Sequence, residues 1–420
     1  MNAPAPGAIG QRAGLVIVVL AQCLGTSLWF SPAGAADGLM ARWQLGPPDF
    51  AWLLASTQIG FIAGTFLLAL TGAADRWRAS RLFAASCLVG AIANAALVAP
   101  GVGYPMAWAV RLLVGLCLAG IYPLGMKLVV QWVGGRPALA LAWLVAMLTL
   151  GTAMPHALRA FGVVWPWQAV LLGSSLLAVI GGALVAAAGD GRFKATPAPG
   201  LRLSAADLRA LLASRELRAS AGGYFGHMWE LYAFWSVVPA LCLSTLLAAA
   251  QRPALGTAGA AGTAWSAWSA WSAWWVPIVI GSGALGCLIG GYAARRRGSA
   301  VVAFAALAGS GLMCALYPLL PTDAWPARLA LLVLWGVLVV ADSPQFSALS
   351  SQAAPAGLLG LALVVQNGIG FFISVVSIVV LGYGLGPWGD KALWLLLPGP
   401  VIGLWAMRSL LSPASRARLH

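Results

Sequence analysis

His227 and Glu230 are two ionisable residues within one long apolar stretch, and their spacing could support proton transfer. Residues three apart share one face of a helix, so an imidazole and a carboxyl lie within reach of each other. Tyr224 and Trp229 stand beside them. An ionisable group inside an apolar span costs several kcal/mol unless it is paired or faces water. We therefore expect these four residues to serve substrate binding or proton coupling; the alternative is a polar pair that holds helices together.

Arg111 is a further candidate because a guanidinium inside an apolar stretch requires an anion. That anion could be Glu230 or an anionic substrate; alternatively, the long side chain extends to the membrane surface. His156 follows Pro155, where an interrupted helix would free backbone groups, and it either touches substrate or is structural. Asp342 stands near the end of another apolar stretch, and it either caps a helix or forms part of an inner gate.

No pattern in the sequence indicates a metal site, a cofactor or an enzyme. The His-x-x-Glu pair lacks the second histidine of the zinc-peptidase motif, in which two histidines four residues apart bind the metal. The six cysteines form no C-x-x-C pair, and small thiols in apolar stretches usually pack as hydrophobic groups: Cys23, Cys87, Cys117, Cys242, Cys287 and Cys314. We expect no catalytic residues, no cofactor and no bound metal.

About a dozen apolar stretches would have to position these groups. Hydrophobic residues make up 61% of the 420 residues, charged residues make up 8%, and the mean hydropathy is +0.89. A bilayer core needs about 20 apolar residues per helix, and its backbone must satisfy its own hydrogen bonds. The sequence therefore predicts an all-α membrane protein with about twelve spans: 14–34, 51–71, 82–99, 106–128, 138–160, 166–188, 220–247, 275–294, 299–320, 327–346, 357–383 and 388–411.

The positive charges fall on alternate loops, and this asymmetry predicts the orientation. On one side, together with both chain ends, lie 18 of the 24 Lys and Arg residues; five lie on the other side, and Arg111 lies inside a span. Cytoplasmic loops are enriched in Lys and Arg, so we expect both termini in the cytoplasm. The Ala- and Gly-rich composition favours a bacterial-type inner membrane. The net charge of +14 then reflects topology, and it does not indicate nucleic-acid binding.

Two segments interrupt the apolar pattern. The basic segment 189–219 has a helix-start signal at Ser204, which predicts a linker with a helix lying on the cytoplasmic membrane surface. This linker would divide the chain into an N-terminal six-helix bundle, 1–188, and a C-terminal six-helix bundle, 220–420. The segment 264–274 repeats tryptophan every third residue, and we expect it to form an aromatic belt at the outer surface.

Short motifs in this layout resemble those of the major facilitator superfamily. Residues 72–81 (GAADRWRASR) are similar to the signature loop of that family, which has a Gly, then Asp-Arg, then further cations; here the Gly stands one place closer to the Asp. Residues 291–298 (GYAARRRG) occupy the equivalent point of the second half, with Ala294 where the Asp would be. Arg111 and Gly115 match the Arg-x-x-x-Gly pattern of the fourth span. The internal echo is typical of transporters built from repeated halves.

The resemblance implies two bundles that rock around a central site lined by the first, fourth, seventh and tenth spans. It also implies that Asp75 and Arg76 act in gating, since a carboxylate near helix N-termini gains from their dipoles. The alternative is that these two residues are only a charged surface loop.

We expect a secondary active transporter that moves a small solute by alternating access. The candidate cations Arg111, His156 and His227 outnumber the acids Glu230 and Asp342, which favours an anionic metabolite carried together with protons. A proton-driven exporter of organic compounds or drugs is the second hypothesis, and a sensor that has lost transport is the third. The expected partners are the small-molecule substrate, protons and the lipid bilayer, and the protein is expected to be a monomer.

Overall fold

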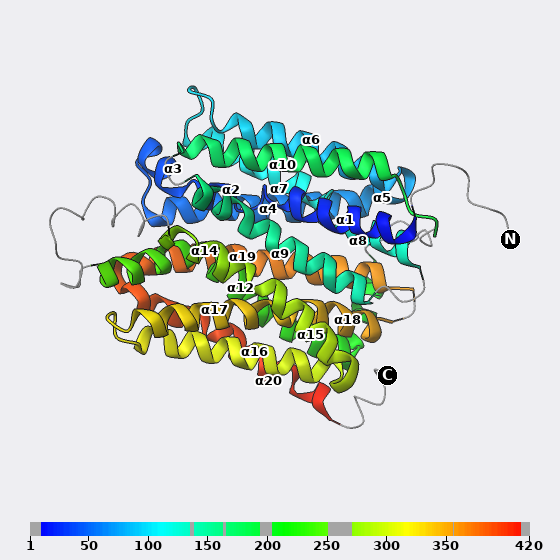
Figure 1. The fold of residues 1–420 in the computed structure, drawn as a ribbon. Coiled ribbons are helices and arrows are strands. Elements are labelled where there is room, and N and C mark those ends of the chain that lie inside the picture. Colours follow the sequence, from blue (N-terminus) through cyan, green and yellow to red (C-terminus); the bar gives the residue numbers. More distant parts are fainter. Residues whose placement is uncertain are drawn as a thin grey trace.

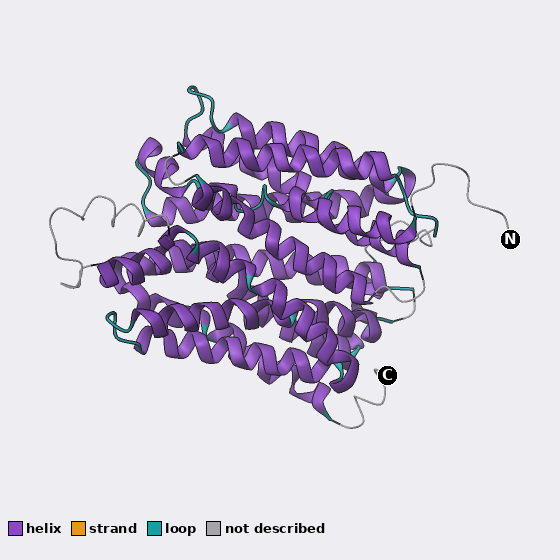
Figure 2. Cartoon of the chain, viewed as in Figure 1, coloured by secondary structure: helices purple, strands orange, loops and turns teal. Residues whose placement is uncertain are grey.

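Helices make up nearly all of the structure. The computed structural model describes residues 10–134, 138–162, 165–193, 204–250, 271–355 and 357–412, and no strand occurs among them (Figure 2). The long helices lie side by side, and their ends gather at two opposite faces of the molecule (Figure 1). Most of the tryptophan repeat and residues 194–203 of the predicted linker lie outside the described residues.

The first part of the chain forms helices α1 to α10. Their bounds are α1 (Gln11–Thr26), α2 (Ser31–Gly34), α3 (Ala36–Trp43), α4 (Pro47–Thr71), α5 (Ala73–Arg76), α6 (Ala79–Ala96), α7 (Tyr104–Ala119), α8 (Tyr122–Val133), α9 (Ala138–Phe161) and α10 (Trp167–Ala188).

The second part begins with a short helix and continues with long ones. The α-helices are α11 (Ala205–Ala213), α12 (Arg215–Ala250), α14 (Trp275–Gly281), α15 (Gly283–Arg297), α16 (Ser299–Leu316), α17 (Trp325–Ala341), α18 (Ser343–Ala353), α19 (Leu359–Trp388) and α20 (Pro398–Met407). Three 3-10 helices connect or end them: η2 (Tyr317–Leu319), η3 (Gly389–Leu396) and η4 (Arg408–Leu411).

The prediction of an all-α protein with many membrane spans is confirmed. Within the described residues, ten helical runs are long and apolar enough to cross a bilayer, and α1 is a shorter apolar helix. One of the ten runs, Leu359–Leu411, contains the last two predicted spans. Between them the chain leaves α19 at Gly389, whose φ of 52° favours glycine, and continues through η3 into α20.

The first and fourth predicted spans are interrupted helices. In the first, α1 ends at Thr26, and α2 begins at Ser31 with Pro32 in its first turn. In the fourth, α7 passes into α8 around Gly120. Proline has no backbone N–H, so it is tolerated where a helix begins. Each interruption frees backbone carbonyl groups that must find donors inside the membrane.

Two groups of helices lie one above the other in Figure 1, coloured from blue to green and from green to red. In the first group α4 packs on α7 and α6 packs on α10; in the second, α12 packs on α20 and α15 packs on α17. Between the groups, α4 lies along α19, and α9 lies along α14 and α15. The division into bundles 1–188 and 220–420 with a linker at 189–219 remains a prediction.

Glycines bring α4 and α7 into backbone contact. A Cβ atom at Gly60 would meet the carbonyl oxygen of Leu112, and a Cβ atom at Gly115 would meet that of Thr57. Both positions therefore require glycine at this separation. The close approach holds Arg111, which directly precedes Leu112 on α7, against α4, where it donates to Thr57.

Helix α11 begins where the sequence predicts a helix start. The Oγ atom of Ser204 accepts a hydrogen bond from the backbone N–H of Asp207 at 3.0 Å, which caps the helix. Leu211 is buried with Leu217 of α12 and Leu361 of α19. The helix is thus anchored to two long helices, while its location on the cytoplasmic surface remains a prediction.

Candidate functional site

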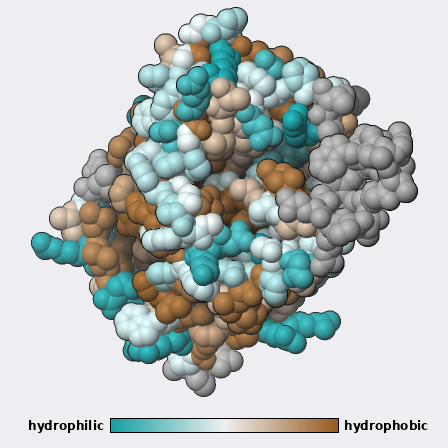
Figure 3. All heavy atoms as spheres, turned by 90° about the vertical axis from the view of Figure 1, so that its left-hand side faces the viewer, coloured by the Kyte–Doolittle hydropathy of each residue, from teal (hydrophilic) through white to brown (hydrophobic). Residues whose placement is uncertain are grey.

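A cavity of about 640 Å³ opens at the end of the molecule formed by α3 and the first turns of α4. We call this the α3 end, and we call the opposite end, where α5, α8 and α18 lie, the basic end (Figure 1). Helices of both groups line the cavity. Figure 3 looks onto the α3 end, where brown apolar side chains lie among polar ones. Most lining residues are apolar, among them Met40, Phe50, Leu54, Leu241, Val276 and Ile378.

Four ionisable side chains line this cavity: Asp37 of α3, His156 and Arg159 of α9, and Asp390 of η3. His156 and Arg159 are three residues apart and therefore share a face of α9. Within the described structure, the buried Nε2 atom of His156 has no hydrogen-bond partner. Arg159 donates from Nη1 to the carbonyl oxygen of Trp165 at 2.9 Å. A role was predicted for His156 but not for Arg159, although the three-residue spacing of the two was a signal available in the sequence.

A cluster of aromatic rings lies deeper along the helices than the residues that line the cavity, and none of these rings is itself a lining residue. Trp29 stacks on Tyr232 at 5.6 Å and on Phe371 at 5.8 Å between ring centroids, and Phe61 lies 4.3 Å from Phe371. Trp235 makes an edge contact with Tyr232 at 5.4 Å. We call these five rings the aromatic floor. They come from four different spans in both helix groups, and only Tyr232 and Trp235, three residues apart on α12, have a spacing that a sequence could reveal.

Arg111 is fully buried, and it contacts no carboxylate among the described residues. Its donors reach four neutral oxygens: Thr57 Oγ1 (3.1 Å), Asn94 Oδ1 (3.0 Å), the Leu28 carbonyl (3.1 Å) and the Trp29 carbonyl (2.7 Å). The two carbonyls belong to the interruption between α1 and α2. The expected pairing with Glu230 therefore does not occur in this structure, and the side chain does not extend to the surface. Arg111 instead stabilises the interrupted first span.

Glu230 is fully buried inside the second helix group. One carboxyl oxygen accepts a hydrogen bond from Ser310 Oγ of α16 at 2.8 Å, and the other accepts one from Trp335 Nε1 of α17 at 2.6 Å. The carboxyl thus joins α12 to two neighbouring helices. The part of α12 that lines the cavity begins at Ser236, so Glu230 lies beyond the cavity wall.

His227 lies against Asp342, and not against Glu230. The Nδ1 atom of His227 is 2.8 Å from a carboxylate oxygen of Asp342, and its Nε2 atom is 2.8 Å from Ser343 Oγ. Both members of the pair are buried. Asp342 stands at the junction of α17 and α18, where the tenth span is interrupted. The structure therefore joins one residue predicted for proton coupling to one predicted for gating.

Tyr224 and Trp229 have different surroundings, and neither lines the cavity. The Tyr224 ring lies 6.1 Å from the His227 ring, and a Cβ atom at Gly370 of α19 would meet it. Trp229 donates from Nε1 to the carbonyl oxygen of Leu395 at 3.0 Å. Tyr224 thus contributes to the closed contact between α12 and α19, whereas Trp229 ties α12 to η3.

At the basic end, Asp75 pairs with Lys127 of α8. A carboxylate oxygen of Asp75 is 2.6 Å from Nζ of Lys127, which also donates to the carbonyl of Ala74. Both side chains are partly exposed, and Arg76 is exposed without an ion pair among the described residues. No pattern in the sequence indicated that Lys127 is the partner of Asp75. The contact joins α5 to α8 within the first group, and the gating role of Asp75 and Arg76 remains a prediction.

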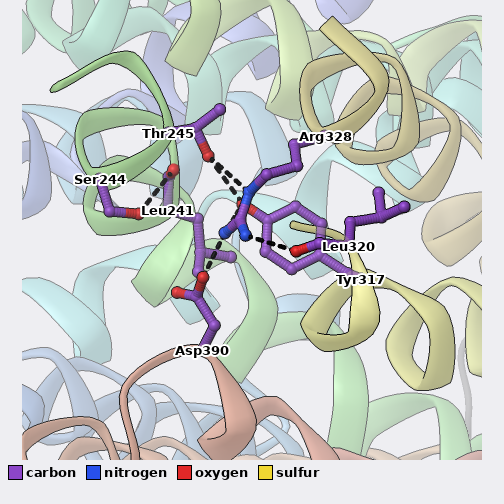
Figure 4. Close-up of polar contacts among 7 residues, drawn as sticks. All are labelled: Leu241, Ser244, Thr245, Tyr317, Leu320, Arg328 and Asp390. Carbon is purple, nitrogen blue, oxygen red and sulfur yellow. Dashed lines mark hydrogen bonds and ion pairs between the residues drawn. The ribbon is translucent and has the colours of Figure 1, made fainter. Parts of the chain in front are cut away.

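An arginine network at the α3 end was not predicted from the sequence. Arg328 is only 2% exposed, and its Nη2 atom pairs with Asp390 at the cavity edge (Figure 4). It also donates to Tyr317 Oη at 3.1 Å, to Thr245 Oγ1 at 3.3 Å and to the Leu320 carbonyl at 3.2 Å. Because Asp390 is 62 residues away in the chain, no local spacing could indicate this pair.

The described residues offer no obvious metal site. No group of three or more His, Cys, Asp or Glu side chains that could hold a metal ion occurs among them. All six cysteines are buried as free thiols.

Two comparisons with known proteins bear on the family and the fold. The family model described as Major Facilitator Superfamily matches residues 15–378. A crystal structure of a bacterial homologue of the human lysosomal transporter Spinster, in an inward-facing and unoccupied conformation, is similar with a TM-score of 0.64 and 12% sequence identity. The match covers 99% of this chain and 97% of that chain, and at this identity it concerns the fold alone. No curated protein has a matching sequence.

Proposed function

This chain belongs to the major facilitator superfamily, and on that premise we propose that it is a secondary active transporter for a small organic anion with an apolar part. The observation that supports the substrate class is the cavity at the α3 end, where His156 and Arg159 share one face of α9 between mainly apolar walls. An anionic group would take charge-assisted hydrogen bonds from these side chains. The apolar walls would bury the rest of the solute.

In this proposal the substrate anion binds Arg159 and His156, and not Arg111. All the donors of Arg111 that contact the protein are directed to oxygens of the first helix group, and the residue does not line the cavity. Arg159 has one backbone acceptor and His156 Nε2 has none among the described residues. These donors are therefore available to a ligand at low cost in broken contacts.

We assign the structure to the outward-facing state of an alternating-access cycle. The cavity opens at the α3 end, which carries few cations and which the positive-inside rule places outside the cytoplasm. At the basic end, α4 packs along α19, with Phe66 against Gly368. Opening toward the cytoplasm then requires the aromatic floor to separate, because its rings belong to both helix groups.

We further propose that protons drive transport through the buried acids of the second helix group. On α12, His227 and Glu230 come before Tyr232 of the aromatic floor, whereas the part that lines the cavity begins at Ser236; Asp342 pairs with His227. A buried carboxyl exchanges protons only when a conformational change brings water to it, and this couples proton movement to the cycle. Export driven by the same protons remains compatible with this arrangement.

The remaining parts of the proposal concern membrane and assembly. We propose a bacterial inner membrane with both termini in the cytoplasm, two six-helix bundles at 1–188 and 220–420, and a monomer. The distribution of Lys and Arg along the chain supports the orientation.

Export of apolar organic compounds or drugs is the second candidate, and the mainly apolar lining of the cavity favours it. Such a solute would need neither His156 nor Arg159. The two candidates therefore differ in whether removal of these two side chains abolishes binding.

The test is a ligand screen by thermal unfolding of the purified full-length protein. Binding to the folded state raises the unfolding midpoint. We expect carboxylates with an apolar part to stabilise the wild type, and we expect this stabilisation to disappear in Arg159→Gln and in His156→Gln. Arg42→Gln is the matched control, because Arg42 lies at the same end, donates to loop carbonyls and does not line the cavity. Stabilisation by neutral compounds alone, or by anions equally in wild type and Arg159→Gln, would refute the anion site.

A further inference from the structure

One exposed face of α15 combines an apolar stripe with three arginines. Leu285, Ile289 and Tyr292 are 59%, 63% and 53% exposed, and their spacing of four and three residues places them in one line along the helix. The line continues to Arg296, flanked by Arg295 and Arg297 at the basic end of α15. A shallow groove follows this face and is lined by these residues, except Leu285, with Leu288 and Ala293.

No Asp or Glu side chain forms an ion pair with these three arginines. All ten Asp and Glu residues of the chain lie within the described residues, and no ion pair connects any of them to Arg295, Arg296 or Arg297. All three side chains are exposed. The partial negative charge at the C-terminus of α15 favours cations nearby, but it balances only a fraction of one positive charge.

The equivalent loop of the first half is arranged differently. There Asp75 pairs with Lys127 at 2.6 Å, and Arg78 lies 3.6 Å from Asp190. In the second half Ala294 stands where the first half has its aspartate. The second-half loop therefore carries three adjacent charges that no Asp or Glu side chain of the chain neutralises.

We propose that this face of α15 binds an anionic phospholipid of the leaflet at the basic end. The phosphate and any further headgroup phosphate take hydrogen bonds from Arg295, Arg296 and Arg297, which suit planar, bidentate recognition of phosphate oxygens. An acyl chain lies along Ile289 and Leu285 toward the membrane centre. Tyr292 stands between the two, at the level where aromatic side chains meet headgroups.

A lipid fits this face better than a soluble phosphate compound does. The apolar stripe is directed to the hydrocarbon layer because no other helix covers Leu285 or Ile289. A soluble anion would use the arginines alone and would leave this stripe unexplained. A lipid uses both, since basic side chains at the membrane surface attract anionic headgroups and the chain stays in the hydrocarbon.

The test measures lipid retention on the purified full-length protein by native mass spectrometry, after addition of phosphatidylglycerol, cardiolipin or phosphatidylcholine. One variant carries Arg295→Gln, Arg296→Gln and Arg297→Gln. Its matched control carries Arg209→Gln, Arg215→Gln and Arg218→Gln, which are also exposed cations of the basic end and remove the same charge. A third variant, with lysine at positions 295, 296 and 297, keeps the charge and the topology signal.

We expect the wild type to retain the two anionic lipids in preference to phosphatidylcholine. The α15 glutamine variant should bind these lipids with on the order of 100-fold lower affinity, since each arginine contributes about tenfold or less. The control variant should lose less than about threefold, and the lysine variant should fall between the two because bidentate contacts are lost. Added glycerol 3-phosphate should not displace the bound lipid.

Three results would overturn the proposal. Equal retention of anionic lipids by the α15 variant and its control would show only general charge attraction. Equal retention of phosphatidylcholine by the wild type would show an unselective apolar surface. Displacement of the lipid by glycerol 3-phosphate would assign the arginines to a soluble phosphate compound. Unfolding midpoints of the variants, measured in the same detergent, exclude loss of folding as the cause.

Discussion

Replacing Arg111 with glutamine should destabilise the fold, while leaving substrate binding largely intact in the protein that remains folded. The guanidinium makes four hydrogen bonds, two of them to the carbonyls freed by the interrupted first span. A hydrogen bond from a charged donor contributes about 1.5–3 kcal/mol, and each buried acceptor left without a donor adds a cost. Removing a buried charge returns part of its desolvation penalty. We expect a net loss of about 2–5 kcal/mol in the free energy of unfolding.

The assay is the thermal unfolding midpoint in detergent, compared among three arginine variants. For a chain of this size about 1 kcal/mol moves the midpoint by roughly 1–2 °C, so Arg111→Gln should lower it by on the order of 5 °C. Arg111→Lys should lower the unfolding midpoint by nearly as much, because one ammonium group cannot reach all four oxygens. Arg159→Gln loses one partly exposed contact and should stay within about 1–2 °C of the wild type.

A double-mutant cycle with Asn94→Ala locates the effect. Asn94 accepts from Arg111 at 3.0 Å, so the two substitutions should be non-additive by about 0.5–3 kcal/mol. The contrary result would be an Arg111→Gln variant with the unfolding midpoint of the wild type that no longer binds the anions found in the ligand screen. Arg111 would then be a substrate residue, and the structural role assigned to it would be wrong.

Other predictions address coupling, gating, topology and the aromatic floor. Glu230→Gln keeps a hydrogen-bonding oxygen but cannot titrate, so proteoliposomes should lose gradient-driven accumulation and keep passive exchange; accumulation at the wild-type level would make Glu230 a packing residue. Asp75→Asn should remove a partly exposed ion pair of about 0.2–1 kcal/mol and shift the balance of inward-open and outward-open states in spectroscopic distance measurements, with Lys127→Gln giving the same shift. Cysteines placed in 189–219 should resist an impermeant reagent in intact cells, whereas cysteines in 249–274 should react. Trp29→Ala should open the aromatic floor and raise solute leak in liposomes, and an unchanged leak would place the seal elsewhere.

The spans were predictable because membrane insertion is decided locally. A helix must supply about 20 apolar residues wherever it crosses the bilayer, so the apolar stretches and the actual helices coincide closely. The limits of this reasoning appear where helices break. Pro32 lies within a stretch that reads as continuous, yet α1 ends before it and the span is divided. The stretch 106–128 extends as α7 and α8 to Val133, because the residues after Lys127 are apolar except for Gln131 and continue the helix.

The candidate site was predicted only in its parts. His156, His227, Glu230 and Asp342 were recognisable because each is ionisable within an apolar stretch, and the structure places all four where they are buried. Their partners were not recognisable. His227 meets Asp342, 115 residues away, and Arg111 meets an amide and carbonyl groups. Such pairs depend on how helices are arranged around each other, and one sequence carries no record of that arrangement.

The donors of Arg111 also set an order of events during synthesis. The carbonyl of Leu28 leaves the ribosome 83 residues before the guanidinium that satisfies it. At about 5–20 residues per second, the gap lasts roughly 4–17 s. During that time the first span is a 16-residue helix followed by free carbonyls, which is short for a stable crossing. The insertion machinery must therefore hold this segment beside water or protein until the fourth span arrives, and slowing translation between the two should increase degradation of the nascent chain.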